Sequence, residues 1–205
     1  MKIGIIGAGM IGSTVAKLWI DAGHEVRLAS RHPEELRELA AKIGASVGTS
    51  KEAADFGEVV MVTIPLAALP DLAREVSLAG KIVLDTSNAY EKRDGDKARE
   101  ATQHPKGSAG WGAEFFPGAR WVKAFNTVYF KTLESEAHRA GDRVGIPLAS
   151  DDIEAMNVAA QLVRDADLDP VIAGPLARGR EFEPGTKVYN TGMSGPDLRN
   201  VLTPN

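Results

Sequence analysis

Three glycines near the N-terminus constrain the fold of this 205-residue chain more than any other feature. The sequence Gly7-Ala8-Gly9-Met10-Ile11-Gly12 follows a short β-rich run, 2–6, and opens a segment of helical character, 10–22. In such a strand–turn–helix unit Gly7 permits the tight turn, Gly9 lets a ligand approach the backbone, and Gly12 allows the helix to pack closely on the strand. The helix N-terminus then attracts a phosphate. The pattern predicts a pyrophosphate site at Gly7, Gly9, Met10, Ile11 and Gly12.

Strand-like and helix-like segments alternate along the rest of the chain. Expected strands are 25–29, 58–64, 81–84, 121–125, 144–149 and 171–173, and expected helices are 33–43, a short one opened by the capping box 49–52, 70–78 and 151–166. This alternation predicts parallel strands joined by right-handed crossovers, with helices on both faces. The expected fold is therefore an α/β, Rossmann-type, doubly wound, mostly parallel sheet that forms a single domain, 1–182.

Two segments interrupt the alternation. The segment 86–120 is rich in glycine and charge and is expected to be a long loop, of the kind that is usually functional or mobile. The segment 183–205 contains several glycines and prolines and is expected to be an irregular C-terminal tail.

The end of the second expected strand indicates which dinucleotide binds. NAD-binding proteins place a carboxylate there to accept from the ribose 2′-hydroxyl. This chain has Ser30, Arg31 and His32 instead, so a 2′-phosphate would meet a guanidinium and a hydroxyl. The substitution favours NADP(H) as the cofactor, although the same residues are also compatible with an ordinary exposed loop.

Polar and turn-forming residues follow three later strands. They are Thr63, Ile64 and Pro65 after one strand, Ser87 and Asn88 after the next, and Ala124 and Asn126 after a third. Because ligands of open α/β sheets bind outside the carboxyl ends of the strands, these residues are expected to line the ribose and nicotinamide. Asn126 is the expected partner of the carboxamide. Ordinary turn chemistry is the alternative for each segment taken alone.

Composition excludes several classes of function. A net charge of −4 offers no basic surface for nucleic acid, and the absence of cysteine excludes disulfides and thiolate metal sites. No apolar run approaches the ~18 residues of a membrane span, and the N-terminus lacks the pattern of a signal peptide. We expect a cytoplasmic protein without a metal, a nucleic-acid partner or a membrane partner.

No acid–base constellation stands out, so no catalytic residue is assigned. A Tyr-x-x-x-Lys pair is absent after each tyrosine, and no Lys-x-x-x-Asn occurs. His104 and His138 are the remaining candidate acids, with solvated surface positions favoured for both. Trp111, Phe115 and Phe116 are interpreted either as a lid over a planar substrate or, preferably, as packing of the loop. Arg178 and Arg180 are interpreted equally as an anion site or as solvated charges.

The chain resembles the F420-dependent NADP reductase family and is similar to the cytosolic domains of the six-transmembrane metalloreductases. The segments that carry the resemblance are 7–12, 30–31, 63–65, 122–127 and 169–176. The resemblance implies NADP(H) bound through Thr63, Ser30 and Arg31, a nicotinamide beside Asn126, and an electron-accepting ring stacked on it. It also implies a homodimer.

Three functions remain open at this point. The first is hydride transfer between NADP(H) and a flavin-like or deazaflavin ring, with F420 as the named candidate, which needs alignment more than a positioned acid. The second is NADPH-dependent reduction of a small carbonyl or imine, against which the missing proton donor counts. The third is an NADP(H)-sensing module without turnover. The fold alone does not choose among them.

Overall fold

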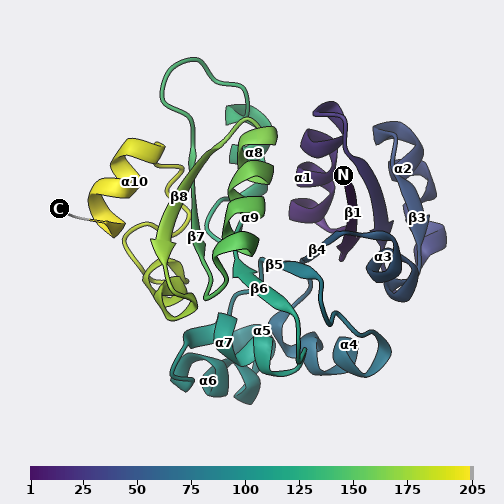
Figure 1. Ribbon diagram of the computed structural model, residues 1–205, viewed down its shortest axis with the longest axis horizontal. Coiled ribbons are helices and arrows are strands. Elements are labelled where there is room, and N and C mark those ends of the chain that lie inside the picture. The colour runs from purple at the N-terminus through teal and green to yellow at the C-terminus, as the bar shows by residue number, and fades with distance from the viewer. Residues whose placement is uncertain (204–205) are drawn as a thin grey trace.

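The computed structural model describes residues 1–203, which contain one eight-stranded sheet with the strand order β3-β2-β1-β4-β5-β6-β7-β8 (Figure 1). All neighbouring strands are parallel except β6 and β7. The strands are β1 (Lys2–Ile6), β2 (Glu25–Ala29), β3 (Ser46–Gly48), β4 (Val59–Val62), β5 (Ile82–Asp85), β6 (Arg120–Lys123), β7 (Gly145–Ala149) and β8 (Asp169–Gly174). The predicted Rossmann-type α/β fold is confirmed.

Helices cover both faces of the sheet. They are α1 (Met10–Asp21), α2 (Arg37–Ile43), α3 (Ser50–Phe56), α4 (Leu69–Glu75), α5 (Glu91–Asp94), α6 (Asp96–Gln103), α7 (Gly107–Glu114), α8 (Phe130–Glu136), α9 (Ile153–Asp165) and α10 (Gly195–Leu202). Short 3-10 turns occupy Pro33–Leu36, Leu66–Ala68 and Leu176–Phe182.

The core divides between the two faces because successive strand residues point to opposite sides. In β4, Val59 and Met61 join the cluster under α1 and α9, whereas Val60 and Val62 join the cluster under α3, α4 and α7. Four consecutive apolar residues are therefore needed to fill both layers, as expected for a parallel sheet covered on each face.

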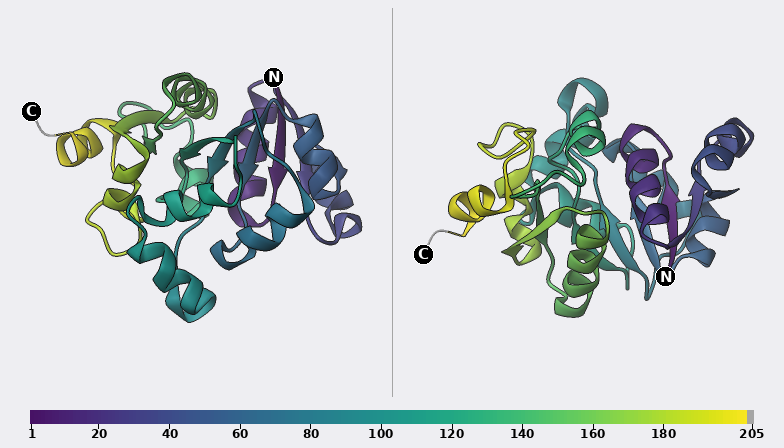
Figure 2. Two further views of the ribbon diagram at one scale, coloured as in Figure 1. Left: turned by 60° about the horizontal axis from the view of Figure 1, so that its bottom comes forward. Right: turned by 90° about the horizontal axis from the view of Figure 1, so that it is seen from above.

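The strand direction reverses at β7, and β7, α9 and β8 extend the sheet at one edge. β7 runs antiparallel to β6 and pairs in parallel with β8, and α9 connects the two. Both views of Figure 2 place the segments around β3 and α10 at opposite extremes of the molecule. A third apolar cluster packs α10 on this edge, through residues that include Leu198, Leu202 and Val171.

The prediction of a long loop at 86–120 is wrong, because most of this segment is helical, in α5, α6 and α7. Glycine has a low intrinsic helix propensity, so the glycine-rich sequence 107–112 favours a loop when read alone. In the structure every residue from 107 to 112 is buried. A Cβ at Gly112 would lie 3.0 Å from Leu69 Cδ1, so the absent side chains let α7 pack closely. Tertiary packing outweighs local propensity here.

The expected irregular tail is also corrected for residues 195–202, which form α10. Ser194 caps this helix by accepting from the backbone N–H of Asp197, and Pro196 occupies the first turn. The Gly-Pro pair therefore marks a helix start rather than a loop. Residues 204–205 of the predicted tail lie outside the described residues. The division of the chain at residue 182 stays a prediction, and the apolar cluster beneath α10 takes side chains from both sides of it.

Two further elements, β3 and α8, were also not predicted from the sequence, and both are short. Among residues 1–203, no helix has the length and apolar character that crossing a bilayer requires.

Candidate functional site

A cleft of about 590 Å³ lies at the carboxyl ends of the central parallel strands. This is the edge where open α/β sheets bind ligands, and the volume falls in the range of small-molecule sites. Eight of the predicted residues line it: Met10, Ile11, Thr63, Ile64, Pro65, Ser87, Asn88 and Asn126. The remaining lining residues are Thr86, Tyr90, Arg93, Phe125, Thr127, Val128, Tyr129, Phe130, Tyr189 and Asn190.

The glycine turn lies next to the cleft. Met10 and Ile11 line the cleft, whereas the predicted Gly7, Gly9 and Gly12 are not lining residues. Gly7 has a φ of 102° and donates its N–H to Ala29 O at 2.9 Å, which fixes the turn beside the end of β2. A Cβ at Gly12 would collide with Gly7 O and lie 2.8 Å from Thr63 Cγ2, whereas a Cβ at Gly9 would meet nothing within 4 Å. Gly12 is thus required by packing inside the protein, and the space over Gly9 is open to a ligand.

The start of α1 fits an anionic ligand. No side chain caps this helix, and its first turn contains no acidic residue. Its unsatisfied N–H groups and the positive end of its dipole therefore face the open space over Gly9. The residues present fit the pyrophosphate of a dinucleotide.

The end of β2 carries Ser30, Arg31 and His32, which lie outside the lining of the cleft. Ser30 Oγ accepts from the backbone N–H of His32 at 3.0 Å. Arg31 and His32 are both exposed. Arg31 forms no hydrogen bond or ion pair within residues 1–203, so its guanidinium is available to a ligand. Ala29, the residue before Ser30, accepts a hydrogen bond from the N–H of Gly7, so the end of β2 is attached to the glycine turn.

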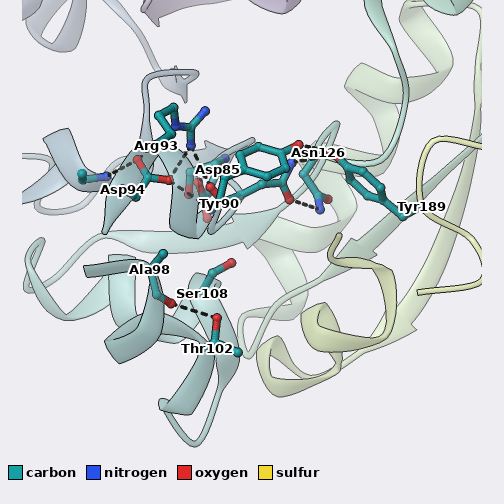
Figure 3. A network of polar contacts seen from close by, with 12 residues as sticks. Asp85, Tyr90, Arg93, Asp94, Ala98, Thr102, Ser108, Asn126 and Tyr189 are labelled. Carbon is teal, nitrogen blue, oxygen red and sulfur yellow. Dashed lines mark hydrogen bonds and ion pairs between the residues drawn. The ribbon is translucent and has the colours of Figure 1, made fainter. Parts of the chain in front are cut away.

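Asn126, which Figure 3 labels, is hydrogen-bonded to Asn88 at the other end of the cleft. Asn126 Nδ2 donates to Asn88 Oδ1 and to Phe182 O, both at 3.0 Å. Asn88 Nδ2 donates in turn to Asn126 O at 2.9 Å. Both residues are buried, yet Asn126 Oδ1 and the nearby Ser87 Oγ have no hydrogen-bond partner among the described residues. An unsatisfied buried oxygen is costly, so these two atoms indicate a ligand that donates hydrogen bonds.

The backbone at Phe125 directs Asn126 into this position. Phe125 is buried and has a φ of 58°, a conformation that is rare for an aromatic residue. Its ring is held edge-on to Trp19 at 5.7 Å. Strained backbone of this kind persists only where the surroundings enforce it, and it concentrates at functional sites.

A buried ion pair supports the floor of the cleft. Asp85 and Lys123 stand opposite each other in β5 and β6, and their side chains are fully buried with Lys123 Nζ 3.1 Å from Asp85 Oδ2. Lys123 Nζ also donates to Ser87 O and to Ser108 Oγ, and Asp85 Oδ1 accepts from the N–H of Ser87. The ion pair therefore fixes the backbone of the segment that contains Ser87 and Asn88.

Tyr90, Tyr189 and Arg93 are cleft residues that sequence reasoning missed. The two tyrosine hydroxyls hydrogen-bond each other, and Asn88 Nδ2 lies 3.4 Å from Tyr189 Oη. Burial raises the pKa of the Tyr189 phenol, and the hydrogen bond to Tyr90 raises it further. Arg93 lies over the Tyr90 ring at 4.8 Å. No local motif signals Tyr189, because it approaches the cleft from the segment expected to be a tail.

Several other candidates lie away from the cleft. Ala124 is fully buried and is not a lining residue. Trp111 and Phe116 pack in the core beneath α7 with Phe115 against them, so they form no lid. The two histidines and two arginines considered as a candidate acid or anion site also form contacts within the protein. His104 pairs with Glu114, His138 with Asp167, Arg178 with Glu181, and Arg180 donates to backbone carbonyls.

The sheet order, the glycine turn and the cleft at the strand ends define a Rossmann-type α/β protein. Comparison with known proteins assigns its family. Residues 2–89 match the family described as NADP oxidoreductase, coenzyme F420-dependent. This segment belongs to that family, and the resemblance predicted from the sequence is confirmed. The family is one of NADP-dependent oxidoreductases.

Individual relatives extend the likeness to most of the chain. Metalloreductase STEAP3 from Rattus norvegicus is 32% identical over 185 residues, which cover 89% of this chain and 36% of that protein. A hypothetical protein from Sinorhizobium meliloti has a TM-score of 0.84 at 26% identity, with 95% of each chain covered. A candidate F420-dependent NADP reductase from Arthrobacter has the same fold, with a TM-score of 0.73 at 22% identity over 88% of this chain and 87% of that one. The chain spans about a third of the length of the curated relatives it matches.

Proposed function

We propose that this protein binds NADP(H) and transfers hydride between its nicotinamide and a flavin-like or deazaflavin ring, with F420 as the named candidate. The observation that carries the proposal is the cleft itself. Met10 and Ile11, at the uncapped start of α1, line one part of it, and Asn126, whose buried amide oxygen has no partner among the described residues, lines another. One end fits a diphosphate and the other fits a hydrogen-bond donor such as a carboxamide, and NADP(H) carries both groups.

Each part of the dinucleotide has residues that would hold it. Gly7, Gly9 and the start of α1 would bind the pyrophosphate. Ser30, Arg31 and His32 would bind the 2′-phosphate, because a guanidinium and a hydroxyl replace the carboxylate that selects NAD. Asn126 Oδ1 would accept from the carboxamide N–H group. Thr63, Ile64 and Pro65 would line the ribose between the two ends.

The acceptor side of the cleft suits a planar ring. Tyr90 and Tyr129 are 37% and 49% exposed, and both line the cleft. Exposed aromatic faces at a binding site offer stacking to a flat partner. When bound, NADPH supplies the hydride, and the protein's contribution is to hold the two rings in contact and in the correct orientation.

Cofactor preference tests the first half of the proposal. Calorimetry should find that NADPH binds more tightly than NADH, and Arg31→Ala should reduce NADPH affinity about 10-fold or more, because charge-assisted hydrogen bonds to the 2′-phosphate are lost. NADH affinity should stay unchanged. Arg164→Ala, which removes an exposed arginine of α9, is the matched control. Equal binding of NADH and NADPH, or an R31A ratio equal to wild type, would show that the cofactor assignment is wrong.

Acceptor turnover tests the second half. Oxidation of NADPH is followed by absorbance after adding F420, FMN, FAD or riboflavin. Turnover with any of them supports the proposal, and an absence of turnover with all four removes it. Tight NADPH binding without any turnover would favour a sensing module instead.

A homodimer is expected from the family resemblance and stays a prediction. Light scattering coupled to size-exclusion chromatography measures it directly. A mass of one chain in the presence and absence of NADPH would contradict the expectation.

A further inference from the structure

The acceptor end of the cleft contains a proton-transfer arrangement that hydride transfer to a flavin-like ring does not need. Tyr90 Oη and Tyr189 Oη hydrogen-bond each other at the end of the cleft where Asn126 presents its unpaired oxygen (Figure 3). The two residues are 99 positions apart, on the segments that follow β5 and precede α10. Bringing two phenols into contact across this distance requires the whole fold.

The cleft has no other side chain that donates a proton in this way. Its lining contains no aspartate, glutamate, histidine or lysine. Its titratable side chains are Arg93 and three tyrosines, and a guanidinium stays protonated at every relevant pH. The third tyrosine, Tyr129, packs its ring on Phe130 and lies at the exposed mouth. Among the described side chains that line the cleft, the Tyr90–Tyr189 pair is therefore the one placed to deliver a proton inside it.

The surroundings of the pair suit donation followed by recharging. Asn88 Nδ2 points to Tyr189 Oη and would hydrogen-bond the oxygen after its proton has left. Arg93 lies over the Tyr90 ring and is held there by Asp94 and by Asn88 O. A positive charge therefore lies beside Tyr90, the phenol that would give its proton to Tyr189. Tyr90 is more than one-third exposed and connects the pair to solvent. The pathway runs from water to Tyr90, then to Tyr189, then to the acceptor.

The chemistry of the acceptor follows from the donor. A reduced flavin-type ring exchanges its proton with solvent, whereas an oxygen or nitrogen that receives the electron pair of a C=O or C=N bond needs a proton as the bond breaks. We propose that Tyr189, recharged through Tyr90, is the proton donor for reduction of a small carbonyl or imine in this cleft. This inference rests on the proposed binding of NADPH, and it adds an activity to the proposed function.

The step balances in atoms and charge. The acceptor carbon forms a C–H bond with the hydride of NADPH, and the electron pair of the C=O or C=N bond moves to the heteroatom. That heteroatom takes the proton of Tyr189 Oη. Tyr189 takes the proton of Tyr90, and Tyr90 takes one from water. The net reaction consumes NADPH and one proton and yields NADP⁺ with an alcohol or an amine.

Substitution of the tyrosines tests the inference with two classes of acceptor. Cyclohexanone and the cyclic imine pyrroline report proton-dependent reduction, and riboflavin reports hydride transfer alone. With cyclohexanone and pyrroline, Tyr189→Phe should lower kcat/KM about 100-fold, which is within the range of general acid catalysis. It should change the riboflavin rate and the NADPH dissociation constant, measured by fluorescence, by less than about 3-fold. Tyr90→Phe should give a smaller loss and reduce the solvent deuterium isotope effect.

Ser135→Ala is the control, because it removes an exposed hydroxyl of α8 that does not line the cleft. It should leave every rate near the wild-type value. The inference is overturned if Y189F reduces cyclohexanone and pyrroline as fast as wild type, if Y189F loses riboflavin turnover equally, or if wild type turns over riboflavin but neither of the other two. If NADPH does not bind to wild type at all, the proposed function itself has failed, and the fluorescence measurement identifies that case.

Discussion

The two ends of the cleft are built in opposite ways. The glycine end consists of backbone and of absent side chains, within six consecutive residues, 7–12. The asparagine end consists of side chains that interlock across the sequence, with Asn88 and Asn126 separated by 38 positions and Asn88 and Tyr189 by 101. The first end offers an anion a ready set of N–H groups, and the second offers a shaped arrangement of oxygens and phenols.

The two ends of the cleft therefore differ in which substitutions would disrupt them. The glycine end has no room for an added side chain at Gly7 or Gly12 but contains little buried polarity. The asparagine end stands on the buried Asp85–Lys123 pair, so its geometry depends on charges that are fully removed from solvent. Three experiments sharpen or break this contrast.

The largest effect is expected at the buried pair. Asp85→Ala leaves the Lys123 ammonium buried without its carboxylate, and removing one partner of such a pair costs about 3–5 kcal/mol. Urea unfolding at neutral pH measures the loss. The double variant Asp85→Ala/Lys123→Met should recover part of it, because no unpaired charge is left. A loss in D85A below about 1 kcal/mol would show that the asparagine end does not depend on this pair.

A smaller effect is expected at the glycine end, where substitutions at Gly12 and Gly9 separate an effect on stability from an effect on binding. Gly12→Ala places a methyl group against Gly7 O and Thr63 and should destabilise the fold by about 1–3 kcal/mol. Gly9→Ala places its methyl group in open space, on extended backbone that alanine adopts, and should leave the unfolding free energy nearly unchanged. It should instead weaken NADPH binding, measured by calorimetry. Unchanged affinity in G9A would indicate that the pyrophosphate binds elsewhere.

The smallest effect concerns Asp94, which holds Arg93 beside Tyr90. Burial raises the pKa of its carboxyl, but the hydrogen bonds from Arg93 and from the N–H of Tyr90 outweigh this and hold the pKa below its ordinary value. A carboxyl with a lowered folded-state pKa stabilises the fold above its unfolded pKa of about 3.9, and this contribution is lost as the pH falls toward the folded value.

The pH profile of stability tests this sign. Wild type should lose unfolding free energy more steeply than Asp94→Asn as the pH falls from about 5 to about 3, so the difference between the two proteins should shrink. Both proteins are followed by urea unfolding at each pH. Parallel profiles would mean that Asp94 is not held by the cation beside it.

The glycine end could be predicted from the sequence because all its information is local. Strand, turn and helix are consecutive, and the reason for each glycine is stated by its immediate neighbours. Asn88 and Asn126 could also be predicted as residues at strand ends, because the parallel sheet brings strand ends to one edge. The structure places both in the cleft.

Tyr90 and Tyr189 could not be predicted as a pair, since nothing in either segment encodes the other. The backbone N–H of Asn190 donates to Thr127 O at 2.7 Å, and this bond holds the Tyr189 segment at the cleft. Such a contact depends on how β7, β8 and α10 pack at the sheet edge. The helix α7 escaped prediction for a related reason, because its glycines are favourable only when a close neighbour is present.

The return of the chain from Phe182 to Asn190 limits how freely this fold can be cut and recombined. The 2–89 segment that identifies the family contains the phosphate turn and Asn88, yet Asn126, Phe182 and Tyr189 meet that asparagine from elsewhere in the chain. Grafting residues 2–89 onto another protein would transfer the proposed phosphate site without Asn126 and Tyr189, which line the other end of the cleft. Under the proposed function, selectivity for the second substrate depends on residues outside 2–89, which include Asn126 and Tyr189, so sequence changes there would alter the acceptor while the proposed phosphate site stays the same.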